Sequence, residues 1–165
     1  MATVSSLPLT ARTSLVRPIV LGGMFIFISQ IIHQWITVTL LQGNPFILVW
    51  QYIASAILGN AAFEGGIGTA LLGVFFHLII SLVIAGVFIL AADRIPLLRR
   101  HPIAGSLLYG FGVFIVMNMI ITPLSAAPPL PAPTLPWLIE AVIEHVVIVG
   151  LALGILVRRN AIANG

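Results

Sequence analysis

Three histidines lie inside stretches of the sequence that are otherwise almost entirely apolar: His33, His77 and His145. A small residue stands four positions before each of them, and these residues are Ser29, Gly73 and Ala141. On a helix, this spacing puts the small side chain one turn before the imidazole and leaves room for a flat macrocycle against the helix. Neutral imidazole is a good ligand for the metal of a tetrapyrrole and for Zn or Cu ions. The histidines are therefore candidate ligands of a metal centre.

Other polar residues could complete such a site. Gln30, Asn118 and Glu144 are candidate cofactor-binding residues, because hydrogen bonds from such groups fix the tautomer and the orientation of a ligating imidazole. A di-iron carboxylate site is disfavoured, because Glu144 directly precedes His145 instead of standing three positions before it.

The composition indicates the surroundings of these residues. Of the 165 residues, 60% are hydrophobic and only 7% are charged, and the mean hydropathy is +1.19. A soluble domain carries about 25% charged residues, so lipid must be the solvent for most of this chain. Cysteine does not occur, which excludes disulfides, thiolate metal sites and cysteine nucleophiles.

Four stretches are long and apolar enough to cross a membrane, which takes about 20 residues. They are residues 18–41, 66–92, 103–124 and 137–157. A fifth apolar stretch, 45–63, is ambiguous. The proline-rich segment 123–136 is expected to be a stiff, extended loop.

The arginines decide between four and five spans. The chain has no lysine, and all seven basic residues are Arg12, Arg17, Arg94, Arg99, Arg100, Arg158 and Arg159. With four spans, the N-terminal tail, the loop at 94–100 and the C-terminus share one side, which the positive-inside rule places in the cytoplasm. With five spans this asymmetry is lost. The tail of 1–17, rich in Ser, Thr and Arg, favours a short cytoplasmic tail and leaves a targeting segment open.

The sequence thus predicts an all-α, polytopic membrane protein with a single transmembrane domain over residues 1–165. Four transmembrane helices form a bundle, and residues 45–63 form a re-entrant or interfacial helix on the outer side, with Trp50 and Tyr52 at the level of the headgroups. Segment 123–136 is also on the outer side.

The polar residues of the spans fall in one layer. Counted from the outer end of each helix, His33 lies about 13 Å deep, His77 about 16 Å and His145 about 12 Å. Asn118 lies about 10 Å deep, and Glu144 is in the same layer. Gln30, His33, Gln34 and Thr37 recur with the i, i+3, i+4, i+7 spacing of one helix face, which should look into the protein. One polar site in the outer half of the bundle is therefore predicted.

Residues 72–129, with the Gly73-to-His77 helix, "Met117-Asn118" and "Pro123-Leu124-Ser125", carry a resemblance to known proteins. The chain resembles a functionally uncharacterised group of small bacterial four-span integral membrane proteins. The resemblance implies the four-span architecture and a bacterial inner membrane, and it implies no catalytic residues.

Three functions stay open. The polar residues could simply hold helices together by interhelical hydrogen bonds, in an accessory or assembly subunit of a larger membrane complex or in a homo-oligomer. They could instead bind a transition-metal ion or a tetrapyrrole. A chlorin is favoured over haem, because haem propionates usually pair with cationic side chains and the arginines lie on the side of the membrane opposite the polar layer.

The third function is an oligomeric proton or solute channel or transporter that uses Glu64, Glu140, Glu144 and the histidines. An enzyme is not favoured, because there is no nucleophile elbow, phosphate loop or HExxH motif. A nucleic-acid partner is not expected, because topology accounts for the arginines.

Overall fold

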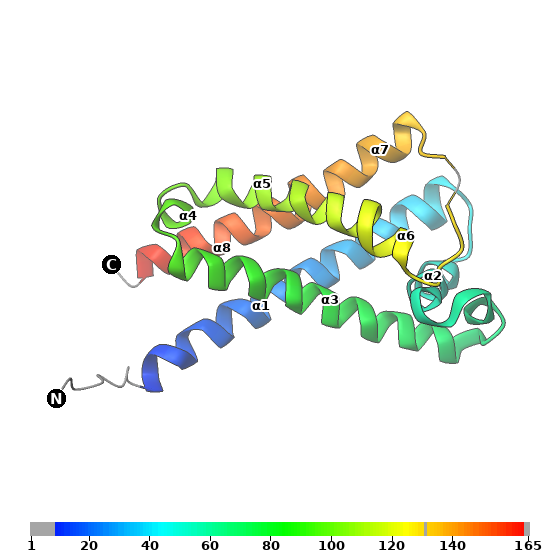
Figure 1. Cartoon of the computed structure of the whole chain (residues 1–165), viewed down its shortest axis with the longest axis horizontal. Helices are drawn as coiled ribbons and strands as arrows, with labels where there is room; N and C mark the ends of the chain where they lie inside the picture. Colours follow the sequence, from blue (N-terminus) through cyan, green and yellow to red (C-terminus); the bar gives the residue numbers. More distant parts are fainter. Residues whose placement is uncertain (1–8, 131, 164–165) are drawn as a thin grey trace.

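The structure is a computed structural model that describes residues 9–130 and 132–163 (Figure 1). Helices make up nearly all of these residues, and no strand occurs among them. Four helices are long and apolar enough to cross a membrane: Leu15–Leu41, Gly66–Arg94, Pro102–Leu124 and Leu135–Arg159. We number them span 1 to span 4 in chain order. They lie close to the predicted ranges, so the prediction of an all-α protein with four spans is confirmed.

Each span consists of one or more helical elements. Span 1 comprises α1 (Leu9–Gln34) and the π-helical segment η1 (Trp35–Leu41), and span 2 is α3 (Gly66–Arg94). Span 3 comprises α5 (Pro102–Ile115), the π-helical segment η3 (Val116–Ile121) and α6 (Thr122–Leu124). Span 4 comprises α7 (Leu135–Val142), the π-helical segment η4 (Ile143–Val149) and α8 (Gly150–Ala163). The connections contain α2 (Ile47–Leu58), its 3-10 continuation η2 (Gly59–Phe63) and α4 (Pro96–Arg100).

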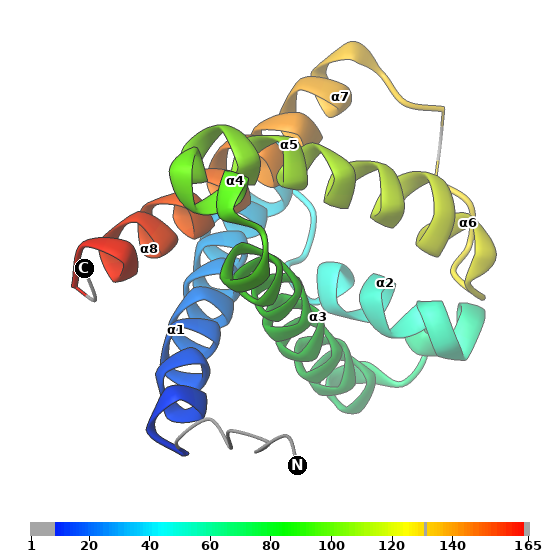
Figure 2. The same cartoon turned by 60° about the vertical axis from the view of Figure 1, so that its left-hand side comes forward.

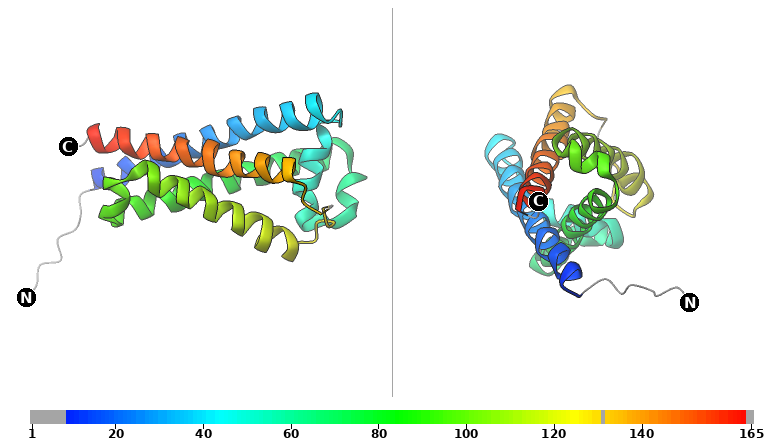
Figure 3. Two further views of the ribbon diagram at one scale, coloured as in Figure 1. Left: turned by 90° about the horizontal axis from the view of Figure 1, so that it is seen from above. Right: turned by 90° about the vertical axis from the view of Figure 1, so that its left-hand side faces the viewer.

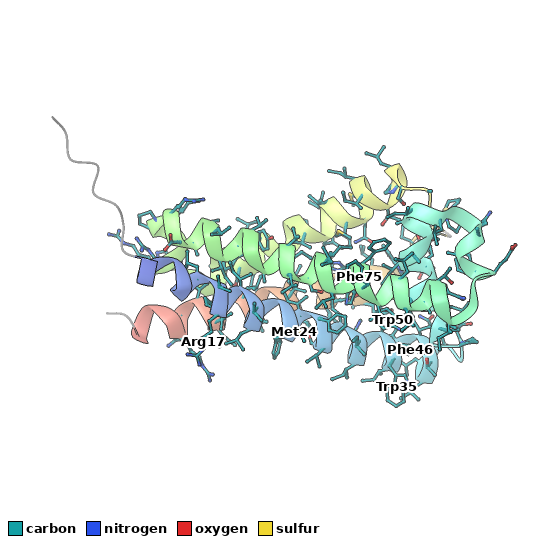
Figure 4. All side chains as sticks on the ribbon, turned by 90° about the horizontal axis from the view of Figure 1, so that it is seen from below. Arg17, Met24, Trp35, Phe46, Trp50 and Phe75 are labelled. Carbon is teal, nitrogen blue, oxygen red and sulfur yellow. The ribbon has the colours of Figure 1, made fainter. Side chains whose placement is uncertain are left out.

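The two ends of the bundle differ in charge. α4, which carries Arg99 and Arg100, lies at the same end as the start of α1 and the finish of α8 (Figures 1 and 3). We call this the arginine end. α2 and the loop before α7 lie at the other end, here called the α2 end; Arg17 and Trp50 mark the two ends in Figure 4. The predicted grouping of the arginines at one end is confirmed. The expectation of a targeting segment falls partly on residues 1–8, which lie outside the described residues.

Small residues let the spans approach closely. Span 1 packs on span 2, and span 3 packs on span 4 (Figure 3). A Cβ atom at Gly150 would lie 2.9 Å from the carbonyl oxygen of Ser106, and one at Gly110 would meet the carbonyl oxygen of His145. Such backbone contacts hold membrane helices together, because lipid offers no hydrophobic driving force between them.

A hydrophobic cluster fills the half of the bundle near the arginine end. It joins spans 1, 2 and 4, and its buried members are Ile26, Ala85, Phe88, Ile89, Ala92, Val149, Leu153 and Val157. Span 3 is tied to this region through Tyr109, whose hydroxyl donates to the carbonyl oxygen of Ile84 at 2.9 Å. This half of the protein is therefore packed with apolar side chains.

α2 lies at the other end of the bundle and is shorter than a membrane span (Figures 1 and 2). It packs on α3, where Gly73 allows the carbonyl oxygen of Trp50 to approach so closely that any side chain at position 73 would clash with it. The side-chain amide of Gln51 also donates to the carbonyl oxygen of Gly66 at 3.2 Å. The backbone N–H of Ala126, beyond span 3, donates to the α2 carbonyl oxygen of Ala56 at 3.0 Å. α2 is thus fixed to two spans.

The first aromatic residue of α2 is covered by protein. Only 7% of Trp50 is exposed, and its ring lies against His77 and Phe46, while its expected position at headgroup level stays a prediction. Tyr52 is half-buried. The reason is the Gly73 contact, which draws α2 onto the side of α3 and puts the tryptophan between the two helices.

The Gly73 contact predicts an asymmetry between two glycines of α3. Gly73→Ala should lower the free energy of unfolding by about 1–3 kcal/mol, because the added methyl group meets backbone that cannot move without shifting α2. Gly68→Ala, in the same helix but with open space around its Cβ position, should leave stability unchanged or raise it by up to about 1 kcal/mol. Unfolding in mixed micelles with increasing SDS measures both. Equal effects of the two variants would contradict this docking of α2.

Candidate functional site

A cavity of about 770 Å³ lies in the half of the protein near the α2 end. It is bounded by η1, α2, α3, η3 and the α7–η4 region. Five of the six predicted cofactor-binding residues line it: Gln30, His77, Asn118, Glu144 and His145. The remaining wall is largely apolar. The structure therefore brings most of the predicted polar layer together around one space.

Glu144 is the most strongly held of these residues. Only 8% of it is exposed, and the side-chain amide of Gln34 donates to both carboxyl oxygens, at 3.1 and 3.2 Å. Nδ1 of His33 lies 3.8 Å from one of these oxygens. A buried carboxyl group without such partners would cost more free energy than an apolar residue, so Gln34 stabilises it in place.

His145 lines the cavity and hydrogen-bonds through one of its two ring nitrogens. Its Nδ1 lies 2.8 Å from the carbonyl oxygen of Ala141, which can only accept, so Nδ1 carries the proton. In the neutral ring Nε2 then bears the lone pair. This is the tautomer that a metal-ligating histidine uses, with its second ring nitrogen bonded to a backbone carbonyl. The ring also packs edge-on against Phe114.

His77 is held differently. Its ring lies between those of Phe27 on span 1 and Trp50 on α2, with centroid distances of 5.5 and 5.7 Å. Its Nε2 is buried without a hydrogen-bond partner. The imidazole therefore serves the packing of α2, α3 and span 1, in addition to lining the cavity.

The three histidines do not form the predicted metal site. Among the residues that the structure describes, no group of three or more His, Asp or Glu side chains could hold one metal ion. His33 does not line the cavity, His77 is enclosed by aromatic rings, and His145 stands alone with its free Nε2. A tetrapyrrole with a single axial imidazole stays a prediction.

The residues of the predicted transport path are also separated. Glu140 lines the cavity one turn before Glu144, whereas Glu64 is exposed in the turn after η2 and does not line it. Below the cavity, the hydrophobic cluster occupies the half near the arginine end. The described residues therefore place only two of the three carboxyl groups at the same site.

Gln34 was named in the polar stripe but not among the predicted site residues. Its position four residues after Gln30 was the available signal, since both fall on the face that lines the cavity. Tyr52 was likewise missed. Burial raises the pKa of its hydroxyl above the ordinary value, and the hydroxyl donates to the carbonyl oxygen of Pro128 at 3.5 Å.

Part of the cavity wall is exposed on the outside of the bundle. α3 and the α5–α6 segment diverge toward the α2 end, and α2 lies between them (Figure 2). Three isoleucines that line the cavity are also exposed: Ile57 on α2 by 64%, Ile79 on α3 by 43% and Ile121 on η3 by 47%. Gln42 and Asn44 line its edge at the α2 end. A ligand could therefore enter from the bilayer.

No protein-family model, curated protein or solved structure matches the chain. The resemblance to a group of small bacterial membrane proteins therefore stays a prediction. What the cavity can do follows from its residues alone.

The Gln34–Glu144 contact can be tested by a double-mutant cycle. Gln34→Leu should destabilise the protein, because it leaves Glu144 buried without its donor. In the double variant with Glu144→Leu, the loss in free energy of unfolding should be smaller than the sum of the two single losses. The difference, which is the coupling energy of the pair, should be about 0.6–1.7 kcal/mol. Stability in mixed micelles measures the cycle.

The matched control pairs Glu144→Leu with Gln42→Leu, since Gln42 is exposed directly after span 1, the span of Gln34, and has no bond to Glu144. That pair should be additive. Additivity in the Gln34–Glu144 cycle as well would mean that the two side chains do not interact.

Proposed function

We propose that the protein binds a small lipophilic molecule inside the membrane, in the cavity beside α2. The supporting observation is the cavity itself, with its volume of about 770 Å³ and an apolar wall facing a short polar one. Sites for small molecules usually measure about 300–1,000 Å³ and are mostly apolar with a few polar groups that orient the ligand. The volume of this cavity lies in that range, and the residues of the polar layer are the few polar groups in its wall.

The exposed part of the cavity wall supports the same proposal. A molecule dissolved in the bilayer reaches exposed residues such as Ile79 and Ile121 without crossing water. Inside, the apolar body of the ligand contacts residues such as Ile80 and Phe76, and its polar group meets Glu144 and His145. Transport is less well supported, because it would need the hydrophobic cluster to open. An accessory role in a larger complex stays a prediction.

We also propose that the arginine end faces the cytoplasm of a bacterial inner membrane. The positive-inside rule supports this orientation, since Arg94, Arg99 and Arg100 occupy a short loop next to two spans. The site then lies in the outer half of the membrane.

The native chain has no cysteine, so single cysteines can test this orientation cleanly. Asn60→Cys, at the α2 end, should react with a membrane-impermeant maleimide in intact bacteria, because it is exposed on the outer side. Leu97→Cys, in α4, should react only after the membrane is permeabilised. The reverse pattern would overturn the orientation, and labelling of both from one side would overturn the four-span topology.

Ligand binding can be followed through tryptophan fluorescence, because Trp50 and Trp137 line the cavity and Trp35 does not. A long-chain alcohol with bromine on its tail, added to protein in lipid nanodiscs, should quench the fluorescence with a saturable component that survives Trp35→Phe. Ile80→Phe fills part of the cavity and should weaken that component, because Ile80 lines it.

Val83→Phe is the matched control, since Val83 lies on α3 with 57% of its surface exposed and does not line the cavity. It should bind the probe as the wild type does. Quenching that never saturates, or that changes equally in both variants, would contradict a binding site.

A further inference from the structure

We infer that the bound molecule carries a protonated amine, which Glu144 and its neighbours hold at the polar wall of the cavity. This inference rests on the proposed function and names the chemical class of the ligand's polar group. It depends on the carboxyl groups of the cavity, on a side-chain amide that makes no hydrogen bond and on the groups that can accept further hydrogen bonds.

The charge of the wall comes from carboxyl groups alone. Glu140 and Glu144 line the cavity, and none of the described residues that line it is an arginine. The chain has no lysine, and the described arginines lie at the arginine end. The donor to Glu144 is the neutral amide of Gln34. The groups that could become cationic are imidazoles: His77 and His145 line the cavity, and Nδ1 of His33 lies 3.8 Å from the carboxyl group of Glu144. While these imidazoles are neutral, a bound cation would compensate a charge that the cavity itself does not balance.

Gln30 provides an independent sign that a polar ligand group belongs here. Only 6% of this residue is exposed, and it lines the cavity. Its side chain makes no hydrogen bond within the described part of the chain, and its amide atoms are accessible from the cavity and not fully buried. A polar group of a ligand could therefore bond to this amide.

Three other groups of the wall can accept further hydrogen bonds. Nε2 of His145 bears a lone pair, because Nδ1 donates to Ala141. The amide nitrogen of Asn118 donates to the carbonyl oxygen of Phe114 at 3.0 Å, which leaves its own oxygen free to accept. The carboxyl oxygens of Glu144 can accept further bonds beside those from Gln34.

A primary ammonium group fits this arrangement, because it has three donors, no acceptor and a positive charge. A carboxylate or phosphate would meet like charge at Glu140 and Glu144. An uncharged hydroxyl could bond to one acceptor but would leave the carboxyl charge unbalanced. The wall therefore selects an amine over an alcohol, and an alcohol over an acid.

Competition among three probes with the same twelve-carbon chain tests this selection. Dodecylamine, dodecanol and dodecanoate each displace the brominated alcohol from protein in zwitterionic nanodiscs. In the wild type, the amine should displace it at a concentration about tenfold or more below that of the alcohol, since a charge-assisted hydrogen bond exceeds a neutral one by that order. Dodecanoate should be the weakest.

Variants distinguish binding of the amine at this site from a general attraction of amines to the membrane. Glu144→Gln should abolish the preference for the amine, so that amine and alcohol displace the probe at similar concentrations. Glu64→Gln, which removes an exposed carboxyl group at the α2 end outside the cavity, should keep the preference. If Glu144→Gln does not fold, Glu140→Gln replaces it and should reduce the preference.

The outcomes distinguish this inference from the proposed function. Equal displacement by amine and alcohol in the wild type would contradict an amine ligand but leave the proposed binding site intact. An amine preference that survives both cavity variants would do the same. Failure of all three probes to displace the brominated alcohol, with no saturable quenching, would overturn both.

Discussion

Hydrocarbon cannot hydrogen-bond to a polar side chain, and this constraint determines where the polar residues of the four spans lie. Gln30, Gln34, Asn118, Glu144 and His145 come from three different spans, and all of them face one cavity instead of the lipid. The half of the bundle near the arginine end carries no such layer and is packed with apolar residues. The protein is thus divided into a packed half that joins the helices and a half that encloses space.

The architecture could be predicted from the sequence because each span is a long apolar stretch and the positions of the arginines agree with one another. Each span exceeds the length that the bilayer requires, and the arginines at 94–100 agree with those at the two termini. The polar layer followed from counting residues along each helix, and it was found at the α2 end as expected. Depth depends only on the rise per residue, so errors in helix phase hardly affect it.

The directions of individual side chains were less predictable, because three spans contain a π-helical segment at the level of the cavity. A π-turn adds a residue and shifts the faces that regular α-helical spacing assigns, and such turns often occur at functional sites. In η4, the adjacent residues Glu144 and His145 both line the cavity. His33 does not, although it belongs to the polar stripe. The packing of α2 against α3 was also unpredictable, since it depends on contacts between distant residues, such as the backbone contact between Trp50 and Gly73.

A cavity with unbalanced carboxyl groups, partly exposed to lipid and closed toward the arginines, is suited to hold a lipophilic molecule rather than to pass an ion. The most direct test is native mass spectrometry of the protein released from its own membrane without detergent exchange. The account predicts that the chain of 17.6 kDa carries one non-covalent, lipophilic, amine-bearing molecule, and that a cavity-filling Ile53→Trp variant does not. A wild-type chain released without a bound molecule would contradict the account, as would a molecule bound equally by the wild type and the Ile53→Trp variant.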